Sequence, residues 1–194
     1  MNESSRIRAN VKAYLVVDLE ATTSNDDSLP KDEMETIEIG AVLVDAHTLE
    51  PMGEFQSFVR PVRHPVLTPF CTELTQISQA MVDGAPLFPE ALTALCSHTL
   101  GERTGVVFAS WGKYDMTQLQ RDCALHRIPY PMPEHLNLKE ELSLVHGQKK
   151  RFGMARALAF LGLPLEGTHH RGIDDARNIA RMLPWIVGGK RLAR

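Results

Sequence analysis

Two carboxylates stand next to each other at the end of a short apolar segment near the start of the chain. Leu15, Val16 and Val17 form the apolar run of a buried strand, and Asp18 and Glu20 follow it. Side chains two positions apart lie on the same face of a strand, so these carboxylates stand side by side. Burial increases the cost of their repulsion. A divalent cation would relieve it, and a metal site needs further oxygen ligands from later in the chain.

Asp115 and Asp175 are the candidates for those further ligands. Asp115 opens a predicted helix directly after a predicted strand at 104–110, so its carboxylate is expected near the same end of the sheet. Asp175 lies in the first turn of the last predicted helix, five positions after His170. Acidic side chains are favoured at a helix N-terminus, and this position lets His170 turn towards the same cavity.

Each of these residues also has a simpler interpretation when taken alone. Asp115 begins a capping-box pattern and could cap its helix. Asp174 and Asp175 could complement the helix dipole, and His170, directly after His169, could be a surface residue. Four carboxylates in this order with a late His-x4-Asp are more specific than any one of them. Together they favour a catalytic metal site.

The order of the predicted elements indicates an α/β fold with one mixed sheet flanked by helices. Alternating apolar side chains predict a half-buried strand at 36–44, and a third strand follows at 52–59. Short connections join these two and the opening strand into an antiparallel meander. Shorter strands are expected at 104–110 and 135–138. The apolar opening strand is expected to lie centrally, between the meander and residues 106–108.

Helical patterns cover most of the remaining chain, at 86–99, 115–126, 140–146, 153–161 and 173–187. The polar, acidic stretch 24–35 is predicted to be a plain loop, with a flap beside the site as the alternative. Three prolines predict an irregular loop at 60–69. We expect a flexible arm at 1–12, one domain at 13–188 and a short tail at 189–194.

Composition limits the classes of function. The net charge of −3 argues against a protein that coats nucleic acid through a broad basic face, but it allows an enzyme that holds a few phosphates through bound metal. No apolar run is long enough to span a bilayer, and the N-terminus lacks the apolar segment of a secretory signal. The three cysteines, Cys71, Cys96 and Cys123, are far apart, which predicts no disulfide framework and a cytoplasmic location.

Six segments together resemble the DEDDh branch of the DEDD 3′–5′ exonuclease superfamily: VVDLEAT, ETIEIGAVLVD, FVRP, FCTELTQI, SWGKYDM and HHRGIDDARNIA. The similarity is greatest to the exoribonucleases that act on histone mRNA and small interfering RNA, and it extends from about residue 14 to residue 185. It implies a ribonuclease-H-like fold, in agreement with the five-stranded mixed sheet expected above.

The resemblance also implies the active-site residues. The first motif falls on Asp18 and Glu20, the second on Asp115, and the third on His170 and Asp175. The four carboxylates are expected to hold two Mg²⁺ or Mn²⁺ ions, which prefer oxygen ligands. His170 is expected to act as the general base that takes a proton from the attacking water. The product would be a nucleoside 5′-monophosphate.

The resemblance places further residues around the substrate. The backbone at Ala21 and Thr22 is expected near the terminal sugar hydroxyl, and Leu74 and Thr75 against the terminal base. Packing at a strand end and a helix cap are the respective alternatives. Arg171, beside the expected general base, is a candidate ligand for a substrate phosphate.

Other residues near the motifs are assigned differently. No role is expected for His169 or for Asp174, which precede the matched positions. Tyr114 stands where animal members have tryptophan, a departure that concerns a stacking contact. Glu38 recurs in the family's second strand, and an outward strand residue is an equal interpretation. The basic run 149–151 either holds upstream phosphates or forms a solvated loop.

The sequence therefore predicts a metal-dependent 3′–5′ exonuclease that acts on the 3′ end of single-stranded RNA or short oligonucleotides, with no membrane partner. A DNA exonuclease of proofreading type is the alternative within the enzymes, because recognition of a 2′-hydroxyl needs only one or two contacts. A non-catalytic nucleic-acid-binding regulatory module is the alternative outside them. The five intact catalytic positions speak against that module.

Overall fold

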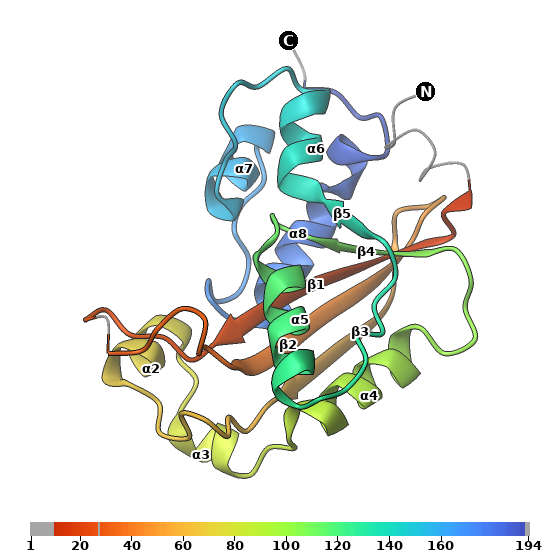
Figure 1. The fold of residues 1–194 in the computed structure, drawn as a ribbon. Helices are drawn as coiled ribbons and strands as arrows, with labels where there is room; N and C mark the ends of the chain where they lie inside the picture. The colour runs from red at the N-terminus through yellow and green to blue at the C-terminus, as the bar shows by residue number, and fades with distance from the viewer. Residues whose placement is uncertain (1–9, 27, 193–194) are drawn as a thin grey trace.

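The expected mixed sheet runs through the centre of the protein, with its strands in the order β3-β2-β1-β4-β5 (Figure 1). The computed structural model describes residues 10–26 and 28–192. Its strands are β1 (Ala13–Ala21), β2 (Thr36–Asp45), β3 (Pro51–Phe58), β4 (Val106–Ser110) and β5 (His135–Asn137). β1 to β3 form the antiparallel meander, whereas β4 runs parallel to β1 and β5 parallel to β4. The fold class and the central position of the first strand are confirmed.

The helices within the described residues are α2 (Pro69–Thr75), α3 (Gln79–Asp83), α4 (Phe88–Thr99), α5 (Tyr114–Leu125), α6 (Leu138–Val145), α7 (Met154–Leu161) and α8 (Gly172–Ile186). The last five follow the sequence prediction closely, whereas α2 and α3 were not predicted. The signal for α2 is local: the Thr68 hydroxyl accepts a hydrogen bond from the Cys71 N–H, and Pro69 occupies the first turn. None of the described helices is both long and apolar enough to cross a membrane.

The alternation of side chains along β1 divides the core into two layers. Tyr14 and Val16 pack in a cluster with α6, α7 and α8. Leu15 and Val17 face the other way and pack with α4 and α5. Asp18 continues the first set, so its carboxylate is directed to the face that α8 covers. β1 ends beside α2 (Figure 1), and Asp18 and Glu20 are near this end of the strand.

The prediction that the second strand is half-buried is wrong, because α8 covers its second face. Every residue of β2 from Thr36 to Val44 is buried. Gly40 makes this possible: a Cβ atom there would lie only 2.0 Å from the carbonyl carbon of Gly172, at the start of α8. Glycine within a strand often marks such a close approach of another backbone. The absence of a side chain at Gly40 therefore sets how near α8 lies to the sheet.

Both ends of the chain pack against this core where they are described. Residues 1–9 of the expected arm lie outside the described residues, but the Lys12 N–H donates to the Gly105 carbonyl at 2.8 Å. In the expected tail, the ammonium group of Lys190 lies 3.8 Å from the centroid of the Trp185 ring on α8. The start of the tail is therefore held by a cation–π contact.

Gly40→Ala is expected to destabilise the protein strongly, because the new methyl group would meet backbone atoms that cannot rotate away. Overpacking of this kind costs about 1–3 kcal/mol or more, and thermal unfolding measures it. Gly53→Ala on β3 is the matched control, since a Cβ atom there has no neighbour within 4 Å. Equal melting temperatures for the two variants would show that α8 can shift without cost.

Candidate active site

Asp115 reaches β1 because β4 is shorter than the strand it pairs with. The parallel ladder between β1 and β4 ends at the pair Val16 and Ala109, before the polar end of β1. Beyond it, the Leu19 N–H donates to Oδ1 of Asp115 at 3.1 Å. The N-cap of α5 is Lys113 and Asp115 is buried, so the capping interpretation of Asp115 is wrong. Its carboxylate instead binds the backbone near the end of β1, close to Asp18.

Asp175 brings a carboxylate from α8 to the same place. Its Oδ2 atom accepts hydrogen bonds from Nδ1 of His169 at 2.9 Å and from the His170 N–H at 3.0 Å. One carboxylate oxygen from each of Asp18, Glu20 and Asp175 lies within 4.8 Å of the others. Two carboxylates from β1 and one from α8 therefore converge closely enough to share a cation.

The five residues predicted to be catalytic line one cavity of about 270 Å³: Asp18, Glu20, Asp115, His170 and Asp175. They come from β1, from the first turn of α5, and from the start of α8 with the loop before it. β1 is the central strand of the sheet, so α5 on one face and α8 on the other both reach its end. The structure thus brings together every residue of the predicted catalytic set.

The electrostatics of this cavity are those of a site that lacks positive charge. Burial, with repulsion from Asp175 and Glu38, raises the pKa of Glu20 to about 8. Burial likewise raises the pKa of Asp115 to about 6 and moves that of Asp18 well above its ordinary value. A buried carboxylate prefers to be neutral unless a cation is near. Oxygen donors grouped in this way fit a hard divalent cation such as Mg²⁺ or Mn²⁺.

His170 has the protonation behaviour and the position that a general base needs. Burial lowers its pKa, so the imidazole is neutral and able to accept a proton near pH 7. Its backbone has φ +63°, the left-handed region that few residues other than glycine adopt. The N–H contact to Asp175 helps to hold that conformation, which directs residue 170 into the cavity.

Of the five predicted substrate-binding residues, two line the cavity, whereas Thr22, Thr75 and Arg171 do not. Ala21 and Leu74 line it. Thr22 is buried, and both its N–H and its hydroxyl oxygen are bonded to the backbone of Glu35. Thr75 is also buried, and its hydroxyl donates to the backbone within α2 at 2.8 Å. Neither threonine is among the lining residues, and Thr75 has the structural role that the sequence left open.

Arg171 does not line the cavity, because its guanidinium group binds Glu38. Nε and Nη2 donate to the Glu38 carboxylate at 3.0 and 3.3 Å, and the Gly172 N–H donates to it at 3.0 Å. Glu38 is fully buried, so the interpretation of it as an outward residue is wrong. This ion pair fastens the first residues of α8 to β2, and the contact of Arg171 with a substrate phosphate stays a prediction.

Sequence reasoning missed several other residues of the cavity wall. Met34, Trp111 and Met154 line it, together with Tyr114, which the sequence analysis noted only for a stacking contact and which is 44% exposed. Met34 brings the end of the acidic loop to the site. The available signal was a large apolar side chain within an otherwise polar loop. His169, for which no role was expected, also lines the cavity.

The basic run 149–151 is not among the cavity-lining residues. Arg151 pairs with Glu140 of α6 at 2.6 Å, and both side chains are largely exposed. An exposed ion pair of this kind contributes little to stability. The solvated-loop interpretation therefore accounts for Arg151.

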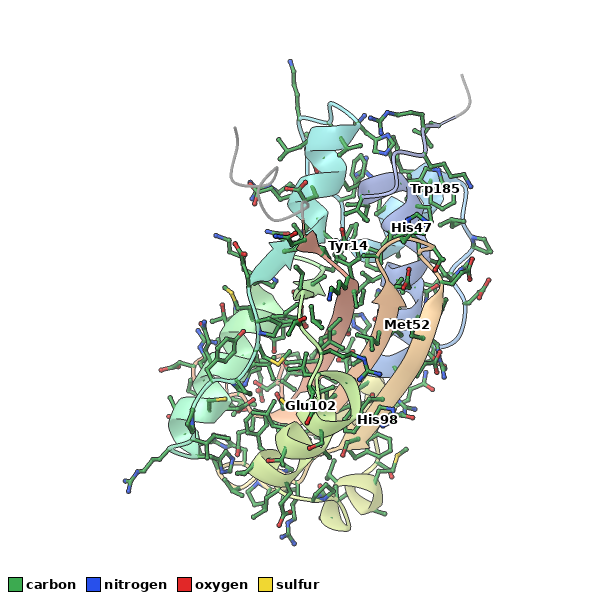
Figure 2. All side chains as sticks on the ribbon, turned by 90° about the vertical axis from the view of Figure 1, so that its right-hand side faces the viewer. Tyr14, His47, Met52, His98, Glu102 and Trp185 are labelled. Atoms are coloured by element: carbon green, nitrogen blue, oxygen red, sulfur yellow. The ribbon has the colours of Figure 1, made fainter. Side chains whose placement is uncertain are left out.

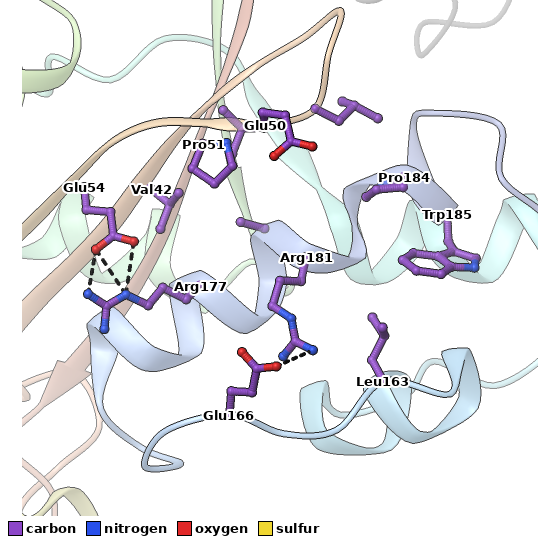
Figure 3. Close-up of a pocket in the computed structure, with 13 residues that line it drawn as sticks. Val42, Glu50, Pro51, Glu54, Leu163, Glu166, Arg177, Arg181, Pro184 and Trp185 are labelled. Atoms are coloured by element: carbon purple, nitrogen blue, oxygen red, sulfur yellow. Dashed lines mark hydrogen bonds and ion pairs between the residues drawn. The ribbon is translucent and has the colours of Figure 1, made fainter.

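A second cavity, of about 440 Å³, lies between the meander and α8 (Figure 3). Both of its arginines are paired with carboxylates of the lining: Arg177 with Glu54 at 2.6 Å, and Arg181 with Glu166 at 2.9 Å. The remaining wall is largely apolar and includes Trp185. Because its lining holds neither histidine nor converging unpaired carboxylates, this cavity lacks the groups for hydrolysis.

Known proteins that are similar to this chain over nearly its whole length are exonucleases. The exonuclease family RNase T matches residues 15–183. ERI1 exoribonuclease 3 from Mus musculus is 34% identical over 184 residues, covering 90% of this chain and 53% of the relative. 3′-5′ exoribonuclease 1 from Rattus norvegicus is 30% identical over 191 residues, covering 94% of this chain and 55% of the relative. The chain thus spans about half the length of these curated relatives.

Solved structures agree with the sequence comparison. The nuclease domain of 3′hExo, a DEDDh family member bound to rAMP, superposes with a TM-score of 0.83 at 30% identity, covering 96% of this chain and 98% of that one. A 3′-exonuclease in a structure of histone mRNA stem-loop recognition gives a TM-score of 0.83 at 30% identity, covering 94% of this chain and 66% of that one.

Without divalent cations, the free energy of unfolding is expected to fall as the pH rises from about 6.5 to about 8. Carboxylates with raised pKa hold protons in the folded state that they lose in the unfolded state, and this stabilisation disappears as the pH passes the folded pKa of Glu20, about 8. His135 and His170 have lowered pKa values, so they change the free energy of unfolding only below about pH 6.5, outside this pH range. Thermal unfolding in EDTA at several pH values measures the trend.

Adding Mg²⁺ or Mn²⁺ is expected to raise the melting temperature more at pH 8 than at pH 6.5, because ionised carboxylates bind the cation.

Glu20→Gln removes one of the negative charges that repel each other in the cavity. In EDTA at pH 8 it should raise the melting temperature by roughly 2–4 °C, the effect of about 1 kcal/mol in a domain of this size, and should weaken the response to metal. Glu102→Gln, on the exposed turn after α4, is the control (Figure 2). Equal metal responses in wild type and Glu20→Gln would contradict the proposed site.

Proposed function

The chain belongs to the RNase T exonuclease family, in its DEDDh branch, and on that basis we propose that it is a metal-dependent 3′–5′ exoribonuclease. It removes nucleoside 5′-monophosphates from the 3′ end of single-stranded RNA. The observation that best supports this proposal is the convergence of four carboxylates and the neutral imidazole of His170 on one cavity. The relatives named exoribonucleases support RNA as the substrate.

Asp18, Glu20, Asp115 and Asp175 hold the metal, which we propose to be two Mg²⁺ or Mn²⁺ ions. The grouping of their oxygen atoms and the raised pKa values of the carboxylates support this assignment. When bound, such ions stabilise the charge that develops on the attacking and leaving oxygens of the phosphodiester. Asp18 is repelled by all three of the other carboxylates, and its strand β1 contacts both α5 and α8.

His170 takes the proton from the attacking water. A lowered pKa keeps its imidazole neutral at the working pH, and proton transfer by a positioned side chain accelerates hydrolysis by about 10²–10⁴-fold. The wall of the cavity formed by Met34, Leu74 and Tyr114 provides an apolar surface for the terminal base. Base stacking of this kind does not depend on the identity of the base.

We also propose a cytoplasmic location. Cys71, Cys96 and Cys123 all lie within the described residues and form no disulfide, which supports a reducing compartment.

His170→Ala is expected to lower kcat by at least about 100-fold, because the attacking water loses its proton acceptor. Metal affinity should stay within about twofold of wild type, since the four carboxylates remain, and calorimetric titration with Mn²⁺ measures it. His47→Ala is the matched control: His47 lies in the turn after β2, at the opposite end of that strand from the site (Figure 2). A near-normal rate for His170→Ala would remove His170 from the mechanism.

Time courses on matched RNA and DNA oligomers labelled at the 5′ end test the proposed function. Stepwise removal from the 3′ end should give a ladder of shortened labelled products, with RNA shortened faster than DNA, in the presence of Mg²⁺ or Mn²⁺ and not in EDTA. Faster shortening of DNA would favour the DNA exonuclease. No shortening of either substrate would favour a non-catalytic binding module.

A further inference from the structure

In the cavity, the side chain of His169 contacts both Asp175 and His170. Its Nδ1 atom lies 2.9 Å from Oδ2 of Asp175 and 3.2 Å from Oδ1. Its ring lies on that of His170, with centroids 4.0 Å apart and an angle of 20° between the planes. The side chain is 39% exposed, so these contacts, and not burial in a core, determine its position.

The contact with Asp175 restricts how that carboxylate is presented. An ionised carboxylate only accepts hydrogen bonds, so Nδ1 of His169 carries the proton in this contact. Oδ2 of Asp175 receives this bond and the bond from the His170 N–H, whereas Oδ1 has only the longer contact to His169. Two donors therefore fix Oδ2 from the side of the loop, while Asp175 keeps an oxygen within 4.8 Å of carboxylate oxygens of Asp18 and Glu20. Partners of this type orient metal ligands and increase metal affinity.

The contact with His170 supports a strained residue. The left-handed backbone conformation of His170 is strained and persists only where surrounding contacts hold it. The His169 ring lies almost parallel to the His170 ring and limits the rotation of that imidazole. Loss of this neighbour would leave the imidazole of His170 free to turn away from the attacking water.

We propose that His169 is a positioning residue with two separable roles: its Nδ1–H orients Asp175 as a metal ligand, and its ring orients His170. This inference rests on the proposed function for the second role. The first role concerns metal binding alone and can be measured without any substrate.

Two variants separate the roles. His169→Asn keeps an N–H donor at the δ position and loses the ring, whereas His169→Phe keeps a ring and loses the donor. His169→Phe should weaken Mn²⁺ binding by about 10–100-fold, and His169→Asn should keep it within about threefold of wild type. At saturating Mn²⁺, His169→Asn should lower kcat by about tenfold or more through misplacement of His170, with a smaller loss in His169→Phe.

Calorimetric titration with Mn²⁺ alone and single-turnover cleavage of RNA at saturating Mn²⁺ give the two readouts. Thermal unfolding in EDTA checks that both variants are folded, which the exposure of the side chain favours. Equal Mn²⁺ affinity in wild type and both variants would overturn the proposal, and so would an equal loss in both variants, since the donor would then be irrelevant. A wild-type protein that binds Mn²⁺ but cleaves no RNA would instead refute the proposed function, and the affinity comparison would still test the contact to Asp175.

Discussion

Repulsion among buried carboxylates is the constraint on which the arrangement of the molecule depends. Asp18, Glu20, Asp115 and Asp175 lie around one small cavity, and burial raises the pKa of each. Groups that repel each other stay together only if rigid elements hold them. The central strand β1 provides two of them, and its neighbours on both faces provide the rest. The same repulsion makes the site a strong attractor for divalent cations, because a bound cation removes it.

The position of α8 shows how the fold resists that repulsion. The helix lies against β2 because Gly40 has no side chain, and Glu38 binds both the guanidinium group of Arg171 and the N–H of Gly172. Glu38 adds negative charge near Glu20, so the anchor itself raises the pKa of that carboxyl group. Glu38 thus adds to the repulsion among the carboxylates, but it also fixes the first residues of α8. The result is that Asp175 and His170 approach β1 from a defined direction.

The second cavity shows why shape alone does not identify the site. It has the larger volume of the two, but two of its glutamates are neutralised by its two arginines. In the candidate active-site cavity, the carboxylates face each other and the neighbouring guanidinium group is bound to Glu38. Converging carboxylates without cationic partners distinguish the candidate metal site from the second cavity. The apolar wall around Leu74 and Tyr114 then adds a surface suited to a nucleobase.

Local sequence predicted the strands, five of the helices, the central position of β1 and the set of residues proposed to be catalytic. Strand periodicity places Asp18 and Glu20 on one face, and the order of the motifs adds Asp115, His170 and Asp175. Tertiary structure alone decided what surrounds them. Whether Glu38 faces solvent depends on α8, which comes more than a hundred residues later, and the partner of Arg171 depends on the same packing. The contact of His169 with Asp175 depends on the path of the loop before α8, which side-chain spacing does not determine. Spacing along the chain fixes which side chains share a face, but only packing between distant elements decides which charges meet.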